Sequence, residues 1–277
     1  MYRKIFIDKY LKNGFSFDEA KEEVDFALEV LFNYTYKDFM LGKSIEKWQL
    51  AKLEKVLNER ISTHRPIQQI IGQAFFYGRK FFVDENTLVP RPETELLVQE
   101  TLKLATKFEK PKILDIGTGT GCIPITLVVE NENIVAESVD ISFETIETAK
   151  KNVLLHNVFE KVRLYQSDLF ENVDGTYNII VSNPPYIPIK DKETLQVEVR
   201  DYDPASALYT SDEYGVEFYI KIIEQAKKYL LPDGYLLFEL GINQHIIVEK
   251  CLKDNGFSDI NVVQDYNSIE RIIIAKA

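Results

Sequence analysis

The chain has 277 residues and a formal net charge of −11, because 33 Lys and Arg stand against 44 Asp and Glu. This acidic balance excludes a protein that coats nucleic acid through nonspecific basic contacts. With 45% apolar and 28% charged residues the composition is that of an ordinary globular protein, and a norm of about 150 residues per domain predicts two domains.

The cysteines and the N-terminal segment favour a cytoplasmic protein. Cys122 and Cys251 are too few and too isolated for a disulfide framework, so we expect two reduced thiols. The opening residues, MYRKIFIDKYLKNG, scatter charges among apolar residues and do not resemble a secretory signal. No run approaches the about 20 apolar residues that a membrane span needs.

The first seventy residues have the pattern of a small helical domain. Residues 16–32 carry apolar side chains at steps of three and four, which is the spacing of one helical face. Ser16 and Glu19 form a capping-box pattern at the start of this stretch. A second helical stretch is expected at about residues 44–60, where Leu and Ile share one face.

After residue 72 the residue pattern changes, first to that of a hairpin and then to alternating strands and helices. Residues 73–89 are rich in Phe, Tyr and Val around Gly78, which predicts a β-hairpin. We therefore expect a helical domain at 1–72, a hairpin linker at 73–90 and a second domain at 91–277.

In the second domain, strands are expected at 112–115, 134–140, 162–166, 177–182, 235–239 and 271–275, and helices at 93–108, 123–130, 142–156 and 215–230. Such alternation implies an α/β fold with a parallel sheet covered on both faces.

A glycine-rich segment, ILDIGTGTGC, follows the first of these strands. Gly117, Gly119 and Gly121 allow the backbone to come close to a ligand at the carboxyl edge of the sheet. Asp140 ends the next strand, where a carboxylate can accept hydrogen bonds from both hydroxyls of a ribose. The spacing is neither that of a dinucleotide fingerprint nor that of a P-loop, so neither NAD nor ATP is favoured. A tight structural turn is the alternative reading.

The second motif, VSNPPYIP, stands directly after the apolar strand YNIIVS. Two prolines cannot continue a central strand, so the chain must leave the sheet at its ligand-binding edge. The side-chain carbonyl of Asn183 and the backbone carbonyl of Pro184 offer two acceptors for a planar NH2 group, and Tyr186 offers a flat face. The motif therefore predicts a site for an amide or an aromatic amine, with a rigid proline turn as the alternative.

Together, GTGTG, the acidic residue after the next strand and NPPY after the fourth strand resemble class I S-adenosylmethionine-dependent methyltransferases that act on a planar nitrogen. The segments LVPRPETELLV, RPIQQIIG, RDYDPASAL, FELG and DYNSIERIIIA narrow the resemblance to the PrmC/HemK family, over essentially the whole chain. Those enzymes methylate the glutamine amide in the Gly-Gly-Gln tip of peptide chain release factors. The resemblance implies a Rossmann-like, seven-stranded, mostly parallel sheet behind a small all-α domain and a hairpin.

The family pattern also implies roles for matching residues. S-adenosylmethionine would be the methyl donor and S-adenosylhomocysteine the product. The resemblance assigns its methionine and ribose side to Gly117, Thr118, Gly119, Thr120 and Gly121, its ribose hydroxyls to Asp140, its adenine to Asp168 and Leu169, and a further contact to Asn183. It assigns the glutamine pocket and its catalytic groups to Asn183, Pro184, Pro185 and Tyr186. Arg91 and Glu93 to Glu95 would organise the site, and a helix-start turn with Pro92 at its first position is the alternative for this segment. Family members often have tryptophan where this chain has Leu169.

Other functions share these motifs. An N-methyltransferase of adenine or guanine in DNA or ribosomal RNA would normally carry a basic region, and none flanks this pocket. A non-enzymatic module that senses S-adenosylmethionine would not need NPPY. His64, His156 and His245 lie in unrelated segments, so we expect neither a histidine base nor a metal site. The expected partner is a release factor, without direct nucleic-acid or membrane contact, and nothing demands more than a monomer.

Overall fold

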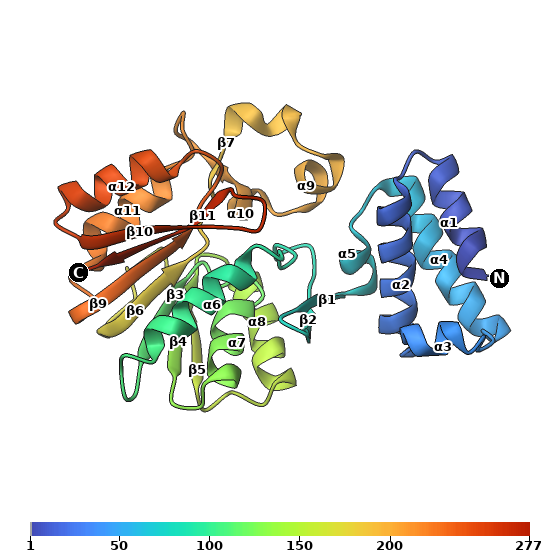
Figure 1. The fold of residues 1–277 in the computed structure, drawn as a ribbon, viewed down its shortest axis with the longest axis horizontal. Helices are drawn as coiled ribbons and strands as arrows, with labels where there is room; N and C mark the ends of the chain where they lie inside the picture. The colour runs from blue at the N-terminus through green and yellow to red at the C-terminus, as the bar shows by residue number, and fades with distance from the viewer. Residues whose placement is uncertain (1) are drawn as a thin grey trace. The chain divides into compact units, whose positions relative to one another are not determined.

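The computed structural model describes residues 2–277, and for Tyr36 and Phe39 it describes the backbone alone. The chain divides into two compact units (Figure 1). The first runs to Gln73 and also takes in Gln196–Tyr202, whereas the second comprises Ala74–Leu195 and Asp203–Ala277.

The first unit is helical, as expected. It contains α1 (Tyr2–Lys12), α2 (Phe17–Phe32), α3 (Tyr36–Met40), α4 (Lys47–Thr63), α5 (Ile67–Ile71) and α9 (Val197–Tyr202). The Ser16 side chain accepts a hydrogen bond from the Glu19 amide at 3.2 Å, which confirms the predicted start of α2. The second predicted helix begins later than expected, at Lys47, because Glu46 caps it together with Gln49.

A buried arginine joins three helices of this unit. The Arg60 side chain on α4 is 2% exposed and donates to Glu19 and Glu23 on α2 at 2.9 Å, and to Glu198 on α9 at 3.0 Å. Burial raises the pKa of Glu23, and the Arg60 charge opposes that rise. The guanidinium also lies 4.7 Å from the centre of the Phe15 ring. The ion pair with Glu198 explains why α9 belongs to the first unit, although it lies more than 120 residues after the rest of that unit in the sequence.

The second unit is built on a seven-stranded sheet in the order β10-β11-β9-β6-β3-β4-β5. Its strands are β3 (Lys112–Ile116), β4 (Val135–Asp140), β5 (Val162–Gln166), β6 (Tyr177–Ser182), β9 (Leu230–Glu239), β10 (Ser258–Gln264) and β11 (Glu270–Lys276). Neighbours from β9 to β5 are parallel, whereas β11 pairs antiparallel with both β9 and β10. The expected mostly parallel sheet is confirmed.

Helices cover both faces of this sheet (Figure 1). They are α6 (Thr94–Ala105), α7 (Cys122–Glu130) and α8 (Phe143–Leu155) on one face, and α11 (Glu217–Ala226) and α12 (His245–Asp254) on the other. Successive strand residues point to opposite faces, so Ile179 packs with the first group of helices and Ile180 with the second. Both are buried, which is why the strand reads as a continuous apolar run.

Smaller elements complete the unit. They are the hairpin β1 (Gln73–Phe76) and β2 (Arg79–Phe82), the parallel pair β7 (Ile187–Pro188) and β8 (Tyr209–Thr210), the 3-10 helix η1 (Ile189–Thr194) and α10 (Ala205–Leu208). The hairpin was expected, and its Phe76 and Phe81 are buried in the same core as α6, α7 and α8. In the described part of the chain no helix has the length and apolar character needed to cross a bilayer.

Candidate active site

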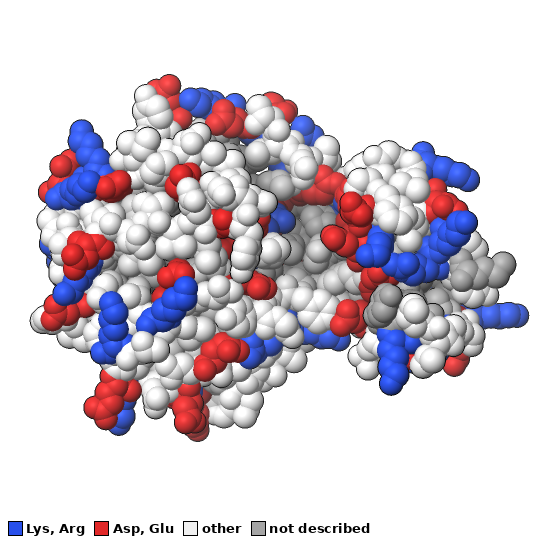
Figure 2. Space-filling model, in the orientation of Figure 1, with Lys and Arg blue, Asp and Glu red and all other residues white. Residues whose placement is uncertain are grey.

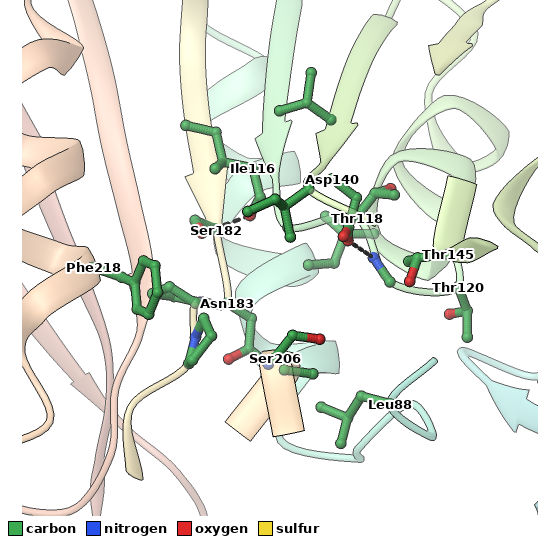
Figure 3. Close-up of a pocket in the computed structure, with 18 of the residues that line it drawn as sticks. Leu88, Ile116, Thr118, Thr120, Asp140, Thr145, Ser182, Asn183, Ser206 and Phe218 are labelled. Carbon is green, nitrogen blue, oxygen red and sulfur yellow. Dashed lines mark hydrogen bonds between the residues drawn. The ribbon is translucent and has the colours of Figure 1, made fainter. Parts of the chain in front are cut away.

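A cavity of about 250 Å³ lies at the carboxyl ends of three parallel strands (Figure 3). Ile116, Asp140 and Ser182, the last residues of β3, β4 and β6, all line it. This is the edge at which open parallel sheets bind ligands, because the loops diverge there and leave a crevice. The fold therefore brings the glycine-rich loop and the NPPY segment to one cavity.

Most residues singled out from the sequence meet there. The cavity is lined by Arg91, Gly117, Thr118, Gly119, Thr120, Asp140, Asp168, Leu169, Asn183, Pro184 and Pro185. Gly121, Tyr186 and Glu93 are not among its lining residues. The three histidines are also absent from the lining, so the cavity contains no imidazole base.

The Asp140 carboxylate is held by the backbone of two loops. One oxygen accepts a hydrogen bond from the Gly119 amide at 3.1 Å, and the other accepts one from the Ser142 amide at 3.1 Å. Burial raises the pKa of Asp140, and these backbone donors counteract the rise. A carboxylate oxygen has two lone pairs, so each oxygen can still accept one hydrogen bond from a ligand. Asp140 is thus fixed in place while keeping two acceptor positions.

The third glycine of the loop, Gly121, serves helix packing, whereas the first two line the cavity. A Cβ at Gly121 would lie 3.1 Å from the Ile125 side chain and 3.4 Å from the Ala149 Cβ. The missing side chain therefore lets α7 begin close against α8, and φ of +78° at this position also favours glycine. Gly117 and Gly119, at φ of +80° and +54°, stay at the cavity wall.

A second carboxylate lies behind the loop. Asp115 is completely buried on β3, accepts a hydrogen bond from the Ser138 hydroxyl at 2.6 Å, and does not line the cavity. Burial raises its pKa to about 7, with the nearby Asp140 charge adding to the rise. The sequence marked Asp115 only as the end of a strand, since burial depends on the neighbouring strands.

The other end of the cavity is formed by NPPY and its neighbours. The Asn183 amide nitrogen donates to the Thr94 hydroxyl at 3.2 Å, and this hydroxyl donates to Glu239 at 2.7 Å. The amide nitrogen of Asn183 therefore faces Thr94, and its carbonyl oxygen is the acceptor that a ligand can meet. Pro184 is buried, which holds the backbone after Asn183 in place.

Tyr186 turns toward the protein interior. Its ring packs against the core under α11 and α12, and its backbone carbonyl accepts a hydrogen bond from Gln244 at 2.8 Å. Burial and the Glu239 charge raise the pKa of its phenol to about 12. Two aromatic residues do line the cavity, Tyr209 of β8 and Phe218 of α11, and Phe218 lies on the same side as Asn183 (Figure 3). No motif marked Phe218, because its helix lies far along the chain from NPPY.

The RPETE segment is anchored by its side chains. Arg91 donates to Asp203 at 2.6 Å, and the Asp203 side chain is fully buried. Burial raises the pKa of Asp203 to about 6 against the opposing charge of Arg91. Glu95 accepts a hydrogen bond from the Tyr77 amide at 2.8 Å, which joins the segment to the hairpin. Arg91 lines the cavity and Glu93 does not.

Leu169 lines the side of the cavity near Asp140, together with Ile141 and Asp168. Its neighbour Phe170 is no substitute for an aromatic ring there. Phe170 is buried in the core and stacks on Tyr229 with ring centres 4.5 Å apart. This wall of the cavity therefore carries two aliphatic side chains and the Asp168 carboxylate, without an aromatic ring.

Several lining residues escaped the sequence analysis. They are Asn86, Leu88 and Pro90 before the RPETE segment, Thr145 on α8, and Ser206, Ala207 and Tyr209 in and after α10. Leu88 and the Ser206 region had a signal, since they belong to segments that carried the family resemblance. Asn86 and Thr145 had none.

Comparisons with known proteins agree with this geometry. Residues 92–200 match the family model of the methyltransferase small domain. The chain is 37% identical to a release factor glutamine methyltransferase of Fusobacterium nucleatum, over 97% of this chain and 76% of that one. It is 41% identical to the same-named protein of Chlorobaculum tepidum, over 80% and 78% of the two chains.

The chain belongs to the release factor glutamine methyltransferase family. It is an enzyme, and as a member of this family it depends on S-adenosylmethionine. A solved methyltransferase of Pyrococcus furiosus shares the fold, with a TM-score of 0.54 and 19% identity over 82% of this chain and 97% of that one.

Proposed function

We propose that this family member transfers a methyl group from S-adenosylmethionine to the side-chain amide nitrogen of the glutamine in the Gly-Gly-Gln motif of peptide chain release factors. The observation that carries the proposal is the shared cavity. Asn183 and Pro184 provide acceptors for an amide in the same space in which Gly117, Gly119 and Asp140 provide a nucleoside site. The names of the relatives support the same substrate.

The residues present fit S-adenosylmethionine. The two remaining acceptor positions of Asp140 match the two ribose hydroxyls, and Gly117 and Gly119 let the backbone approach the methionine part. Ile141 and Leu169 offer an aliphatic wall to the adenine. When bound, the cofactor supplies an electrophilic methyl group on a sulfonium.

The protein's contribution on the substrate side is positioning. An amide nitrogen is a poor nucleophile because its lone pair is delocalised. The Asn183 side-chain oxygen and the Pro184 carbonyl accept hydrogen bonds from its two N–H groups and hold the nitrogen toward the methyl group. Methylation displaces one of these N–H protons, which is released to water. Positioning of this kind is worth about 7 to 11 kcal/mol, so no strong base is required. Phe218 lines this end and offers an aromatic face, whereas Tyr186, for which the sequence predicts this role, is not among the lining residues.

The helical unit is proposed to contact the release factor. Met40, Leu41 and Trp48 lie close in sequence and are 71%, 74% and 60% exposed, which is typical of an interaction surface. Trp48→Ala and Leu41→Ser should raise KM for the release factor several-fold and leave kcat unchanged. Leu154→Ser, at a 69% exposed position of α8, is the matched control. An unchanged KM in both helical-unit variants contradicts this contact.

Methylation of nucleic acid is the second candidate, and the surface charge disfavours it. On the face in Figure 2, Lys and Arg of the second unit are interspersed with Asp and Glu. With the net charge of −11, this surface suits a protein substrate better than a polyanion. A sensor without catalysis is disfavoured by the acceptors of Asn183 and Pro184, which a sensor does not need.

The test is a transfer assay with labelled S-adenosylmethionine and three substrates: release factor, duplex DNA and ribosomal RNA. We expect label on the Gly-Gly-Gln glutamine and none on a release factor in which this glutamine is replaced. Label on nucleic acid alone would refute the proposal, and label on no substrate would favour the sensor.

We also propose that the enzyme works in the cytoplasm as a monomer. Both cysteines are free, with Cys122 buried, which fits a reducing compartment. Sedimentation at working concentration tests the oligomeric state, and a dimer would contradict this part of the proposal.

A further inference from the structure

Two buried residues lie next to Asn183 and do not themselves belong to NPPY, and one of them, Thr94, also lines the cavity. Thr94 begins α6 and is 3% exposed, and Glu239 ends β9 and is 2% exposed. Their side chains come from segments 145 residues apart and meet at 2.7 Å, with the Thr94 hydroxyl donating to the Glu239 carboxylate. Asn183 in turn donates to the Thr94 hydroxyl at 3.2 Å.

The direction of these hydrogen bonds follows from their donors. An ionised carboxylate can only accept, so the single hydrogen of the Thr94 hydroxyl must point to Glu239. The hydroxyl oxygen then presents a lone pair to Asn183, which can satisfy it only with its N–H group. Rotating the Asn183 amide by half a turn would bring two acceptor oxygens together. The Glu239 carboxylate therefore determines which end of the Asn183 amide faces the cavity, through the Thr94 hydroxyl and through its own interaction with the Asn183 side chain.

We propose that Thr94 and Glu239 are positioning residues, which orient the Asn183 amide so that its carbonyl oxygen meets the substrate's N–H group. The inference rests on the proposed function, because it assigns a role in recognition of the same amide. It gives a physical task to Thr94, which the resemblance placed only within a segment that organises the site, and to Glu239 of FELG, to which the resemblance gave no role.

The surroundings of Glu239 make the arrangement sensitive to pH. Burial is the main cause that raises its pKa to about 7, the Glu93 charge adds to the rise, and Thr94, Arg271 and Asn183 oppose it. The other titratable groups that sense the Glu239 charge are Cys122, Tyr186 and Tyr219. A protonated Glu239 can donate a hydrogen bond to the Thr94 hydroxyl. The hydroxyl hydrogen can then point to Asn183, so the orientation of the Asn183 amide is no longer fixed. We expect kcat to fall as the pH decreases through about 7.

The decisive comparison is Thr94→Ser with Thr94→Val in the full-length enzyme. Serine keeps the hydroxyl, whereas valine keeps the shape and removes the hydrogen bonds. We expect kcat for release factor methylation to stay within threefold in Thr94→Ser and to fall at least tenfold in Thr94→Val. The dissociation constant of S-adenosylmethionine should change less than twofold in both variants.

Glu239→Gln provides a second measurement that does not depend on the valine variant folding well. Glutamine fills the same space but does not titrate in this range, so the fall of kcat below about pH 7 should disappear. Persistence of the wild-type pH profile in Glu239→Gln would overturn the inference. Equal kcat values for Thr94→Ser and Thr94→Val would also overturn it.

Wild-type turnover is the reference that separates the two proposals. If the wild type methylates no release factor, the proposed function fails and this inference fails with it. The other case is an active wild type with equal kcat values for the two Thr94 variants, or with an unchanged pH profile in Glu239→Gln. Only the roles of Thr94 and Glu239 are then refuted.

Discussion

Asp140 offers the sharpest test of the cofactor site. Its two oxygens each accept one backbone hydrogen bond, from Gly119 and from Ser142, and so each keeps one position for a ribose hydroxyl. Asp140→Ala removes both positions. Hydrogen bonds to a charged group contribute about 1.5 to 3 kcal/mol each, so the loss is about 3 to 6 kcal/mol. At about 1.4 kcal/mol per factor of ten, affinity for S-adenosylmethionine should fall about 10²- to 10⁴-fold.

Asp140→Asn should not rescue binding. An asparagine amide has one acceptor and one donor group, so its NH2 would meet the N–H of either Gly119 or Ser142. Asp174→Asn is the matched control, because Asp174 is an exposed carboxylate that does not line the cavity. Calorimetric titration with S-adenosylmethionine and S-adenosylhomocysteine gives the affinities. Binding by Asp140→Ala within threefold of wild type would refute the assignment.

Three further predictions concern catalysis and stability. Asn183→Ala should lower kcat about 10²- to 10³-fold by removing one substrate acceptor, with cofactor affinity nearly unchanged in titration. Asp115 has a pKa of about 7 when folded against an ordinary 3.8, so the folded state holds its proton more tightly. Its contribution to stability is present at low pH and is lost as the pH rises from about 4 to 7, by up to about 4 kcal/mol. Asp115→Asn should lack this loss in urea unfolding followed by circular dichroism at pH 5 and 8. Arg60→Met leaves the Glu23 carboxylate without its buried cation and should cost about 3 to 5 kcal/mol in the first unit.

A specific experimental result would contradict each of these three predictions. Wild-type turnover by Asn183→Ala would remove its role as acceptor. An unchanged pH dependence of unfolding in Asp115→Asn would mean that Asp115 is not the titrating group. For Arg60→Met, the fluorescence of Trp48 reports the unfolding of the first unit, because this residue is the only tryptophan of the sequence and lies in that unit. An unaltered urea midpoint of this fluorescence would show that the first unit is equally stable without the ion pairs of Arg60.

The sheet was predictable because its central strands are buried on both faces. The segment YNIIVS reads as one apolar run and forms β6 over the expected residues, Tyr177–Ser182. The edge strand β10 was missed, since its side chains are exposed or half-buried and its short polar–apolar alternation, Asp259 to Val262, is broken by Val263. Helix α12 was missed as well, and it buries only Val248 and Leu252. Periodicity reports burial, so elements with little burial leave a weak pattern.

The site was predictable where its residues are contiguous. Gly117 and Asn183 were found because each lies in a short motif directly after a strand. Phe218 and Glu239 depend on contacts between segments far apart in the chain, and no local pattern reports such contacts. Tyr186 shows the converse, because the side chain of a residue inside a motif can pack against the core and stay out of the cavity lining.

The ion pairs of Arg60 have a consequence for exchanging parts between relatives. Because Glu198 on α9 pairs with Arg60, the first unit consists of two separate pieces of chain. A cut after Gln73 does not release a complete module, since it removes the helices to which α9 belongs and leaves Glu198 without its arginine. A chimera that replaces the N-terminal helices with those of another species must therefore carry residues 196–202 from the same donor. The two chain segments of the first unit therefore have to be exchanged together, which a single crossover cannot do.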